Sequence, residues 1–254
     1  MTTGRRGSHL AATVLLTVGL LAAGPASATE VRVACAANFR DAAEEIGSAF
    51  GTATGHAVTF SFGSTGQLFA QIAFGAPFDA FLAADRARAA KAVDEGLAVA
   101  GSQFTYAFGR IALFSADTGL VHGPEVLTAP RFSKLAVAEP SVAPYGQAAV
   151  EAMRELGVLG LVSDRVVRGL SVAQAYQFVR SGNAELGFVA LSQIAYHAEG
   201  SRWIVPTRLH RAIRQDAVLL VRGAGNDAAK AFLAFLAGGE VLEILAKYGY
   251  GRGE

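Results

Sequence analysis

The sequence predicts an α/β protein of two lobes, each a mainly parallel sheet flanked by helices, with a ligand cleft between the lobes. Three observations carry this prediction. Strand and helix patterns alternate along the chain. An extended stretch at Phe104–Ser115 is followed by a second set of strand and helix units from Lys134. A late strand at Ala217–Val221 then returns the chain to the first lobe. We therefore assign 29–105 with 216–254 to lobe 1 and 106–215 to lobe 2.

The individual elements follow from hydrophobic periodicity and from breaker residues. The first helix illustrates the pattern, because its apolar residues recur at helical spacing and form one buried stripe. Strands are predicted at Glu30–Cys35, Ala57–Phe62, Ala80–Ala83, Tyr106–Ser115, Lys134–Ala138, Arg165–Gly169, Leu186–Ala190, Trp203–Val205 and Ala217–Val221. Helices are predicted at Phe39–Phe50, Gln67–Phe74, Asp85–Glu95, Tyr145–Leu156, Val172–Ser181, Asp227–Ala237 and Glu240–Tyr248.

The first 28 residues have the pattern of a secretory signal peptide. Arg5 and Arg6 precede a short apolar run at Leu10–Leu21, and Ala26-Ser27-Ala28 is a small-residue cleavage site. The run is shorter than the roughly 20 residues that a membrane span needs. We expect cleavage after Ala28, which leaves 226 of the 254 residues in the mature, exported chain. An uncleaved anchor is the alternative.

Composition excludes several classes of function. Loss of Arg5 and Arg6 takes the formal charge from +1 to −1, and no basic run remains, so nucleic acid is not an expected partner. Cys35 is the single cysteine and lies in an apolar strand, as a buried side chain would. The five histidines fit no metal-ligand spacing. The sequence contains no catalytic motif, and we expect a monomer with no cofactor and no enzymatic activity.

Two neighbouring strands each end in small polar residues and then a helix. After Val31–Cys35 come Ala36-Ala37-Asn38, and after Val58–Phe62 come Gly63-Ser64-Thr65-Gly66. A helix start carries unpaired N–H groups and a partial positive charge, so it attracts anions. The amide of Asn38 and the hydroxyls of Ser64 and Thr65 can also donate hydrogen bonds. The structural alternative is a plain N-cap at Asn38 and a capped turn at Ser64.

Two later segments repeat this arrangement of a turn followed by a helix start. Pro144 precedes a helix whose first residues include Tyr145, with a free amide and a phenol. Ser171 precedes a further helix as a natural N-cap, which leaves the amide of Val172 facing forward. A tyrosine ring packed on its own loop and an ordinary cap are the structural alternatives. Four such starts together favour the binding of one oxyanion without chemistry.

These segments resemble the periplasmic molybdate-binding proteins of ABC importers, over about Val31 to Gly251. The specific parts are Ala36-Ala37-Asn38-Phe39, Ser61-Phe62-Gly63-Ser64-Thr65-Gly66, Gly75-Ala76-Pro77-Phe78-Asp79, Ala83-Ala84-Asp85, Ala143-Pro144-Tyr145-Gly146, Gly187-Phe188-Val189-Ala190 and Tyr248-Gly249-Tyr250. The resemblance implies a type II periplasmic binding protein fold, capture of molybdate and also tungstate, and delivery to a membrane permease.

By the same resemblance, neutral donors from both lobes hold a tetrahedral oxyanion through its oxygens, with no direct metal ligand. The implied contacts are Ala37, Asn38, Ser64, Thr65, Tyr145 and Val172. Some relatives have Ser or Thr where this chain has Ala37, and a tyrosine where it has Ala190; Tyr145 is the expected replacement for that phenol.

The physics of the ligand agrees with such a pocket. A fully deprotonated dianion accepts hydrogen bonds only, so it suits a pocket made of donors, whereas a protonated phosphate would need an acidic acceptor. Sulfate differs from molybdate mainly in size, so a sulfate receptor is an alternative. A secreted enzyme that uses Asp79 or Cys35, and an extracytoplasmic sensor subunit, are further alternatives.

Overall fold

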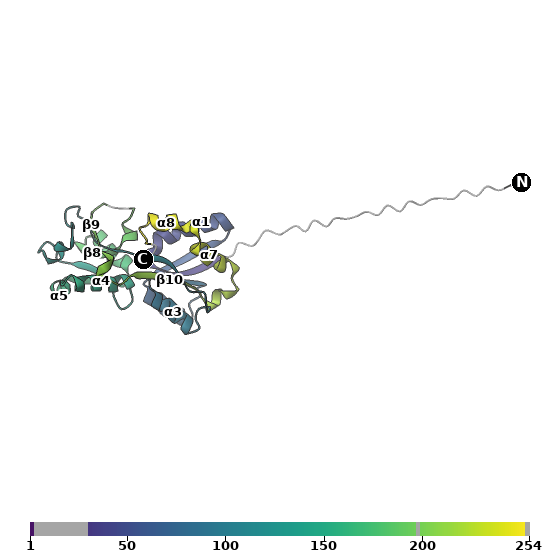
Figure 1. Cartoon of the computed structure of the whole chain (residues 1–254), viewed down its shortest axis with the longest axis horizontal. Helices are drawn as coiled ribbons and strands as arrows, with labels where there is room; N and C mark the ends of the chain where they lie inside the picture. The colour runs from purple at the N-terminus through teal and green to yellow at the C-terminus, as the bar shows by residue number, and fades with distance from the viewer. Residues whose placement is uncertain (3–29, 197–198, 252–254) are drawn as a thin grey trace.

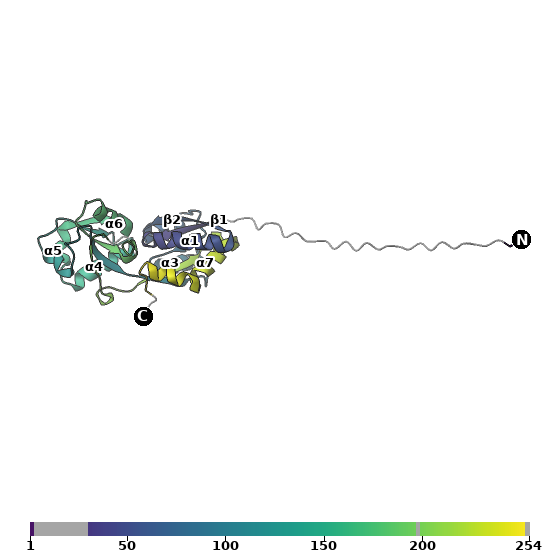
Figure 2. The ribbon, with the colours of Figure 1, turned by 90° about the horizontal axis from the view of Figure 1, so that it is seen from above.

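The computed structural model describes residues 1–2, 30–196 and 199–251, and these form two lobes side by side (Figures 1 and 2). The predicted signal peptide and its cleavage site lie outside the described residues, apart from Met1 and Thr2. Within the described part of the chain, no helix has the length and apolarity that a bilayer span requires.

The first lobe is built on a five-stranded sheet in the order β2-β1-β3-β10-β4. Its strands are β1 (Glu30–Ala36), β2 (Ala57–Gly63), β3 (Ala80–Leu82), β4 (Phe104–Gly109) and β10 (Ile213–Leu219). β1 pairs in parallel with β2 and β3, and β10 runs antiparallel to β3 and β4. The parallel pairs bring the carboxyl ends of β1 and β2 to one edge of the sheet, where ligand-binding loops of α/β sheets gather.

The second lobe repeats this plan in the order β7-β6-β8-β5-β9. Its strands are β5 (Ile111–Ser115), β6 (Leu135–Ala138), β7 (Val166–Gly169), β8 (Leu186–Ala190) and β9 (Ser201–Ile204). β6 pairs in parallel with β7 and β8, whereas β5 is antiparallel to β8 and β9. Each sheet is therefore mixed, with its parallel half made of strands that lead into helices.

Helices cover the sheets of both lobes. The first lobe carries α1 (Arg40–Thr54), α2 (Thr65–Ala73), α3 (Arg86–Asp94), α7 (Asp227–Ala237) and α8 (Leu242–Lys247). The second carries α4 (Pro144–Glu155), α5 (Leu159–Val162) and α6 (Val172–Arg180). The predicted apolar stripe of the first helix is buried, and Phe50 packs edge-on against Phe232 of α7, with ring centroids 5.4 Å apart. Burial of such a ring contributes roughly 1.5–3 kcal/mol.

The predicted strand Tyr106–Ser115 is wrong as one element, because the chain changes sheets within it. β4 ends at Gly109 in the first sheet, and β5 begins at Ile111 in the second. An unbroken apolar run is compatible with either sheet, so periodicity does not reveal the crossing at Arg110. The first sheet thus keeps residues up to Gly109 and from Ile213, a few residues beyond the lobe boundaries expected at 105/106 and 215/216.

Candidate oxyanion site

A small cavity lies between the lobes, at the carboxyl ends of β1, β2, β6 and β7. Both lobes contribute to its lining, which consists of Ala36, Ala37, Asn38, Gly63, Ser64, Thr65, Ala84, Ala143, Pro144, Tyr145, Ser171 and Val172. The structure therefore brings together all six residues that the sequence singled out. Their role as contacts of an oxyanion stays a prediction.

In the first lobe, α2 presents its start to the cavity. Ser64 is the N-cap, and its hydroxyl accepts from the amide of Gln67 and donates to the Gln67 Oε1, at 3.4 and 2.8 Å. Its proton is thus engaged within the helix. Thr65 Oγ1 accepts from the amide of Ala84 at 3.0 Å, which leaves the hydroxyl proton of Thr65 for another acceptor. Thr65, 1% exposed, is accordingly the hydroxyl donor of this turn.

In the second lobe, α4 and α6 present their starts from the opposite side. Pro144 occupies the first turn of α4, and Tyr145 follows it with an amide that no intrahelical carbonyl can reach. Ser171 caps α6 by accepting from the amide of Gln174 at 3.2 Å, so the amide of Val172 is likewise left to the cavity. The sequence predicted both starts from Pro and Ser at the positions where these residues begin helices.

Asn38 does not form the plain N-cap that was the structural alternative for this residue. A single 3₁₀ turn, η1 (Ala37–Phe39), precedes α1, and neither helix start has a side-chain cap. The Asn38 side chain is 4% exposed, and its Nδ2 donates to Gln215 Oε1 at 2.7 Å and to the hydroxyls of Tyr145 and Tyr250, both at 3.1 Å. A buried network of long-range partners has therefore overridden local capping.

The phenol of Tyr145 is held as a neutral donor. Its oxygen accepts from Asn38, so its own proton is available to the cavity that it lines. Burial, and next the neighbouring Tyr250, raise the pKa of Tyr145 well above 10.0, the ordinary value for tyrosine. The hydroxyl consequently keeps its proton at physiological pH and does not itself repel an anion.

The electrostatic character of the cavity comes from dipoles rather than from ionised groups. None of the described side chains that line it is an acid, a lysine, an arginine or a histidine. Helix starts, one threonine hydroxyl and one phenol surround the space with positive dipole ends. Such a set stabilises a multiply charged acceptor and offers nothing to a ligand that must donate a proton.

Two residues that could have supported an enzyme are engaged elsewhere. Asp79 Oδ2 accepts from the amide of Arg32 at 2.8 Å, on the sheet edge remote from the cavity. Cys35 is fully buried, and burial raises the pKa of its thiol far above the usual range. Neither lines the cavity. In the described ranges, no group of three or more His, Cys, Asp or Glu side chains is placed to hold a metal ion.

Hydrogen bonds also join the lobes around the cavity. The amide of Gly66 donates to the carbonyl of Val142 at 2.9 Å. Arg88 Nη2 donates to the carbonyl of Ser141 at 2.6 Å, while its Nη1 pairs with Asp85. The hydroxyl of Ser192 in the second lobe donates to the carbonyl of Asn38 at 2.7 Å. The lobes are thus in contact on more than one side of the cavity, as a closed binding protein requires.

Sequence reasoning missed the residues behind the cavity. Gln215 and Ser192 carry no motif, and Tyr250 enters only as part of the family resemblance. Their contacts with Asn38 span 177, 154 and 212 residues of sequence, so no local pattern could have revealed them.

Two lobes with a cavity between them and a lining of uncharged donors are the architecture of a two-lobed solute-binding protein. The chain belongs to the family described as bacterial extracellular solute-binding proteins, whose model matches residues 31–251. It is 50% identical over 240 residues to the molybdate-binding protein ModA of Rhodobacter capsulatus, covering 94% of each chain. It is 48% identical over 242 residues to ModA of Azotobacter vinelandii, covering 94% of this chain and 96% of that one.

A solved structure is similar over the same region. The periplasmic molybdate-binding protein of Azotobacter vinelandii superimposes with a TM-score of 0.85 and 37% identity, covering 88% of this chain and all of that one. All three of these relatives are named as molybdate-binding proteins. The type II periplasmic binding protein fold, expected from the sequence, is confirmed.

Proposed function

We propose that this protein captures molybdate in the periplasm and delivers it to the membrane permease of an ABC importer. One observation carries the proposal. Four helix starts, two from each lobe, converge on one cavity whose lining is uncharged and rich in donors. The names of the relatives, molybdate-binding proteins that match over nearly the whole chain, support molybdate as the ligand.

The proposed contacts divide between main chain and side chain. The amides of Ala37, Asn38, Thr65, Tyr145 and Val172 and the hydroxyls of Thr65 and Tyr145 donate to the oxyanion. Ser64 acts mainly by shaping the turn, since its hydroxyl already bonds Gln67. Each donor to a charged acceptor contributes about 1.5–3 kcal/mol where water is excluded. Molybdenum itself has no protein ligand, and the function requires no cofactor and no covalent step.

The proposed mechanism is closure of the lobes on the ligand. Thr65 donates from the first lobe and Tyr145 and Val172 from the second, so a bound dianion has its full set of donors only when the lobes meet. Binding therefore shifts the population toward the closed form, by the difference in affinity between the two forms. The permease then distinguishes loaded from empty protein by the relative position of the lobes.

Tungstate has the same charge and shape as molybdate, so we propose it as a second ligand. Sulfate is the principal competing ligand, because it too is a tetrahedral dianion and only size separates it from molybdate. A role as a sensor subunit shares the same binding chemistry. The enzyme alternative has no support in the cavity, since Asp79 and Cys35 lie outside its lining.

Titration calorimetry of the purified mature protein with molybdate, tungstate and sulfate tests the proposal. We expect one site per monomer, similar affinities for molybdate and tungstate, and much weaker binding of sulfate. Sulfate binding as tight as molybdate binding would overturn the choice of ligand. Phosphate serves as a control, because the donor-only lining offers no acceptor for its proton.

A further inference from the structure

Behind the cavity, Asn38 is held by three residues that do not line it, in addition to Tyr145, which does. Its carbonyl accepts from the hydroxyl of Tyr250 at 2.8 Å and from that of Ser192 at 2.7 Å. Its Nδ2 donates to Gln215 at 2.7 Å, and to Tyr250 and Tyr145 at 3.1 Å each. An amide nitrogen has two hydrogens, so one serves Gln215 and the other is shared between the two phenols.

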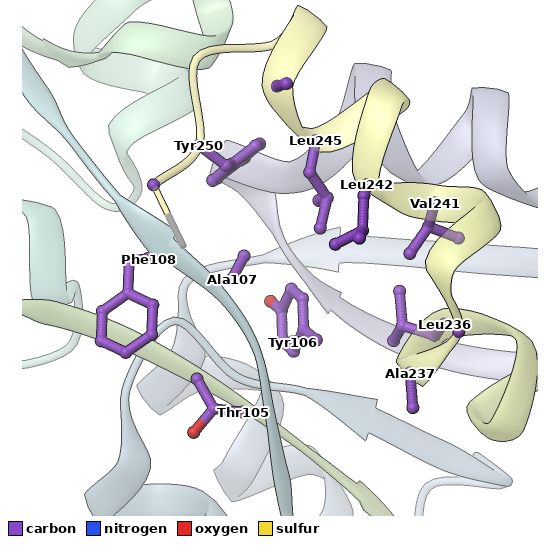
Figure 3. Close-up of a pocket in the computed structure, with 13 residues that line it drawn as sticks. Thr105, Tyr106, Ala107, Phe108, Leu236, Ala237, Val241, Leu242, Leu245 and Tyr250 are labelled. Atoms are coloured by element: carbon purple, nitrogen blue, oxygen red, sulfur yellow. The ribbon is translucent and has the colours of Figure 1, made fainter. Parts of the chain in front are cut away.

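Tyr250 reaches this position because the chain end is attached to the strand that leads to the second lobe. After α8, Gly249 adopts a φ of 73°, a left-handed turn that favours glycine. The amide of Gly251 then donates to the carbonyl of Phe108 on β4 at 2.8 Å. Figure 3 shows Tyr250 on this segment beside β4, with Tyr106 on the strand. The Tyr250 ring packs edge-on against Phe39, with ring centroids 5.2 Å apart.

Gln215 provides the second fixed point. It is fully buried at a bulge in β10, where the register with β4 shifts between Gln215 and Asp216. Its Oε1 accepts from Asn38 and, at 3.4 Å, from the hydroxyl of Tyr106. Two donors thus fix which way the amide faces, and its Nε2 is buried without a hydrogen-bond partner among the described residues. A buried donor without a partner destabilises the fold, so a glutamine at this position indicates that its acceptor oxygen has a role of its own.

We propose that Tyr250 and Gln215 are positioning residues for the oxyanion site; the inference rests on the function proposed above. They orient the Asn38 amide so that it donates to the oxygen of Tyr145, and this hydrogen bond directs the phenol proton toward the ligand. Tyr250 also holds the Asn38 carbonyl, which fixes the peptide that begins the first helix. The C-terminal segment is therefore part of the binding apparatus, although it does not line the cavity.

The arrangement also links the site to the crossing strands. Gln215 is on β10 and Tyr250 is bonded beside β4, the two strands at which the chain passes between the lobes. Tyr145 and Ser192 approach Asn38 from the second lobe. Asn38 thus completes its hydrogen bonds only in the closed form, and correct positioning of Asn38 favours closure.

The test is Tyr250→Phe, which keeps the ring on Phe39 and removes the hydroxyl, with Tyr248→Phe as the matched control. The Tyr248 hydroxyl bonds Glu45 at 2.8 Å, away from the cavity. We expect Tyr250→Phe to weaken molybdate binding roughly tenfold. The ligand-free variant should stay folded, with a melting temperature lowered by no more than the loss of one buried hydroxyl's hydrogen bonds explains. Tyr248→Phe should bind as the wild type does. Gln215→Met carries the same prediction as Tyr250→Phe and serves as the second variant should the first fail to fold.

A double-mutant cycle separates positioning from general damage. Gln215 contacts Asn38 only through the Asn38 side chain, so adding Gln215→Met to Asn38→Ala should weaken binding no further. Wild-type affinity in both Tyr250→Phe and Gln215→Met, or a full additional loss from Gln215→Met in the Asn38→Ala background, would overturn the inference while leaving the proposed function intact. Failure of the wild-type protein to bind molybdate would overturn both.

Discussion

Gly66 is where the closed form can be tested without altering any donor side chain. It is the second residue of α2 in the first lobe, and its amide bonds the carbonyl of Val142 across the lobe interface at 2.9 Å. A Cβ at Gly66 would lie 3.0 Å from both the Cα and the Cβ of Val142. The Cα belongs to the backbone and cannot move aside as a side-chain end does. The substitution Gly66→Ala therefore obstructs closure.

The expected loss of molybdate affinity follows from the free-energy cost of overpacking, which is about 1–3 kcal/mol. Because the contact exists only when the lobes meet, the cost falls on the closed, ligand-bound form. Each 1.4 kcal/mol is a factor of ten, so the Kd for molybdate should rise about 5- to 150-fold. The ligand-free protein should melt at the same or a higher temperature, since alanine is the better helix former.

Calorimetry with molybdate and thermal melting of the ligand-free protein measure the two effects. Gly160→Ala is the matched control, because a Cβ at Gly160 in α5 would meet no atom of another element within 4 Å. It should leave the affinity unchanged. Wild-type affinity in Gly66→Ala would refute the reasoning that ligand binding requires these two loops to meet.

Three further predictions concern the donors. Thr65→Val should weaken molybdate binding by about 1.5–3 kcal/mol in calorimetry, whereas Thr65→Ser should bind almost normally, since only the hydroxyl matters. Gly109→Ala should weaken binding at least about tenfold without contact to the ligand, because its Cβ would overlap the Tyr145 hydroxyl; normal affinity would contradict the position given to this phenol. Burial raises the pKa of Tyr106, Tyr145 and Tyr250, so molybdate affinity should be constant from about pH 6 to 9. The free energy of unfolding should be constant below about pH 10 and fall above it, since the unfolded chain loses these tyrosine protons first. Circular dichroism at increasing pH measures this stability. A molybdate affinity that titrates near neutrality would contradict the prediction of constant affinity.

Much of the site was predictable because each part of it is local. A strand, a small polar turn and a helix start are encoded within about ten residues, and the capping roles of Ser64 and Ser171 are confirmed. Parallel pairing places the turns at Asn38 and Thr65 on one edge of the first sheet, and those at Tyr145 and Val172 on one edge of the second. The predicted cleft between the lobes then brings the two edges to one cavity.

The parts that sequence reasoning missed depend on distant partners. Asn38 has the right residue type for a cap, yet Gln215 and Tyr250 draw its side chain into the core. The crossing at Arg110 is likewise set by which sheet offers a partner on each side, since β4 and β5 are both apolar. Local propensity describes neither event, because both are decided by partners that are distant in the sequence.

The central claim is that one tetrahedral dianion is bound between the two lobes by the helix starts and hydroxyls described above. A crystal structure of the protein grown with molybdate, with data collected at the molybdenum absorption edge, tests it most directly. The account predicts a single strong anomalous peak in the cavity, within hydrogen-bond reach of Thr65, Tyr145 and the amide of Val172. A peak at any other place, or none at saturating molybdate, would contradict it.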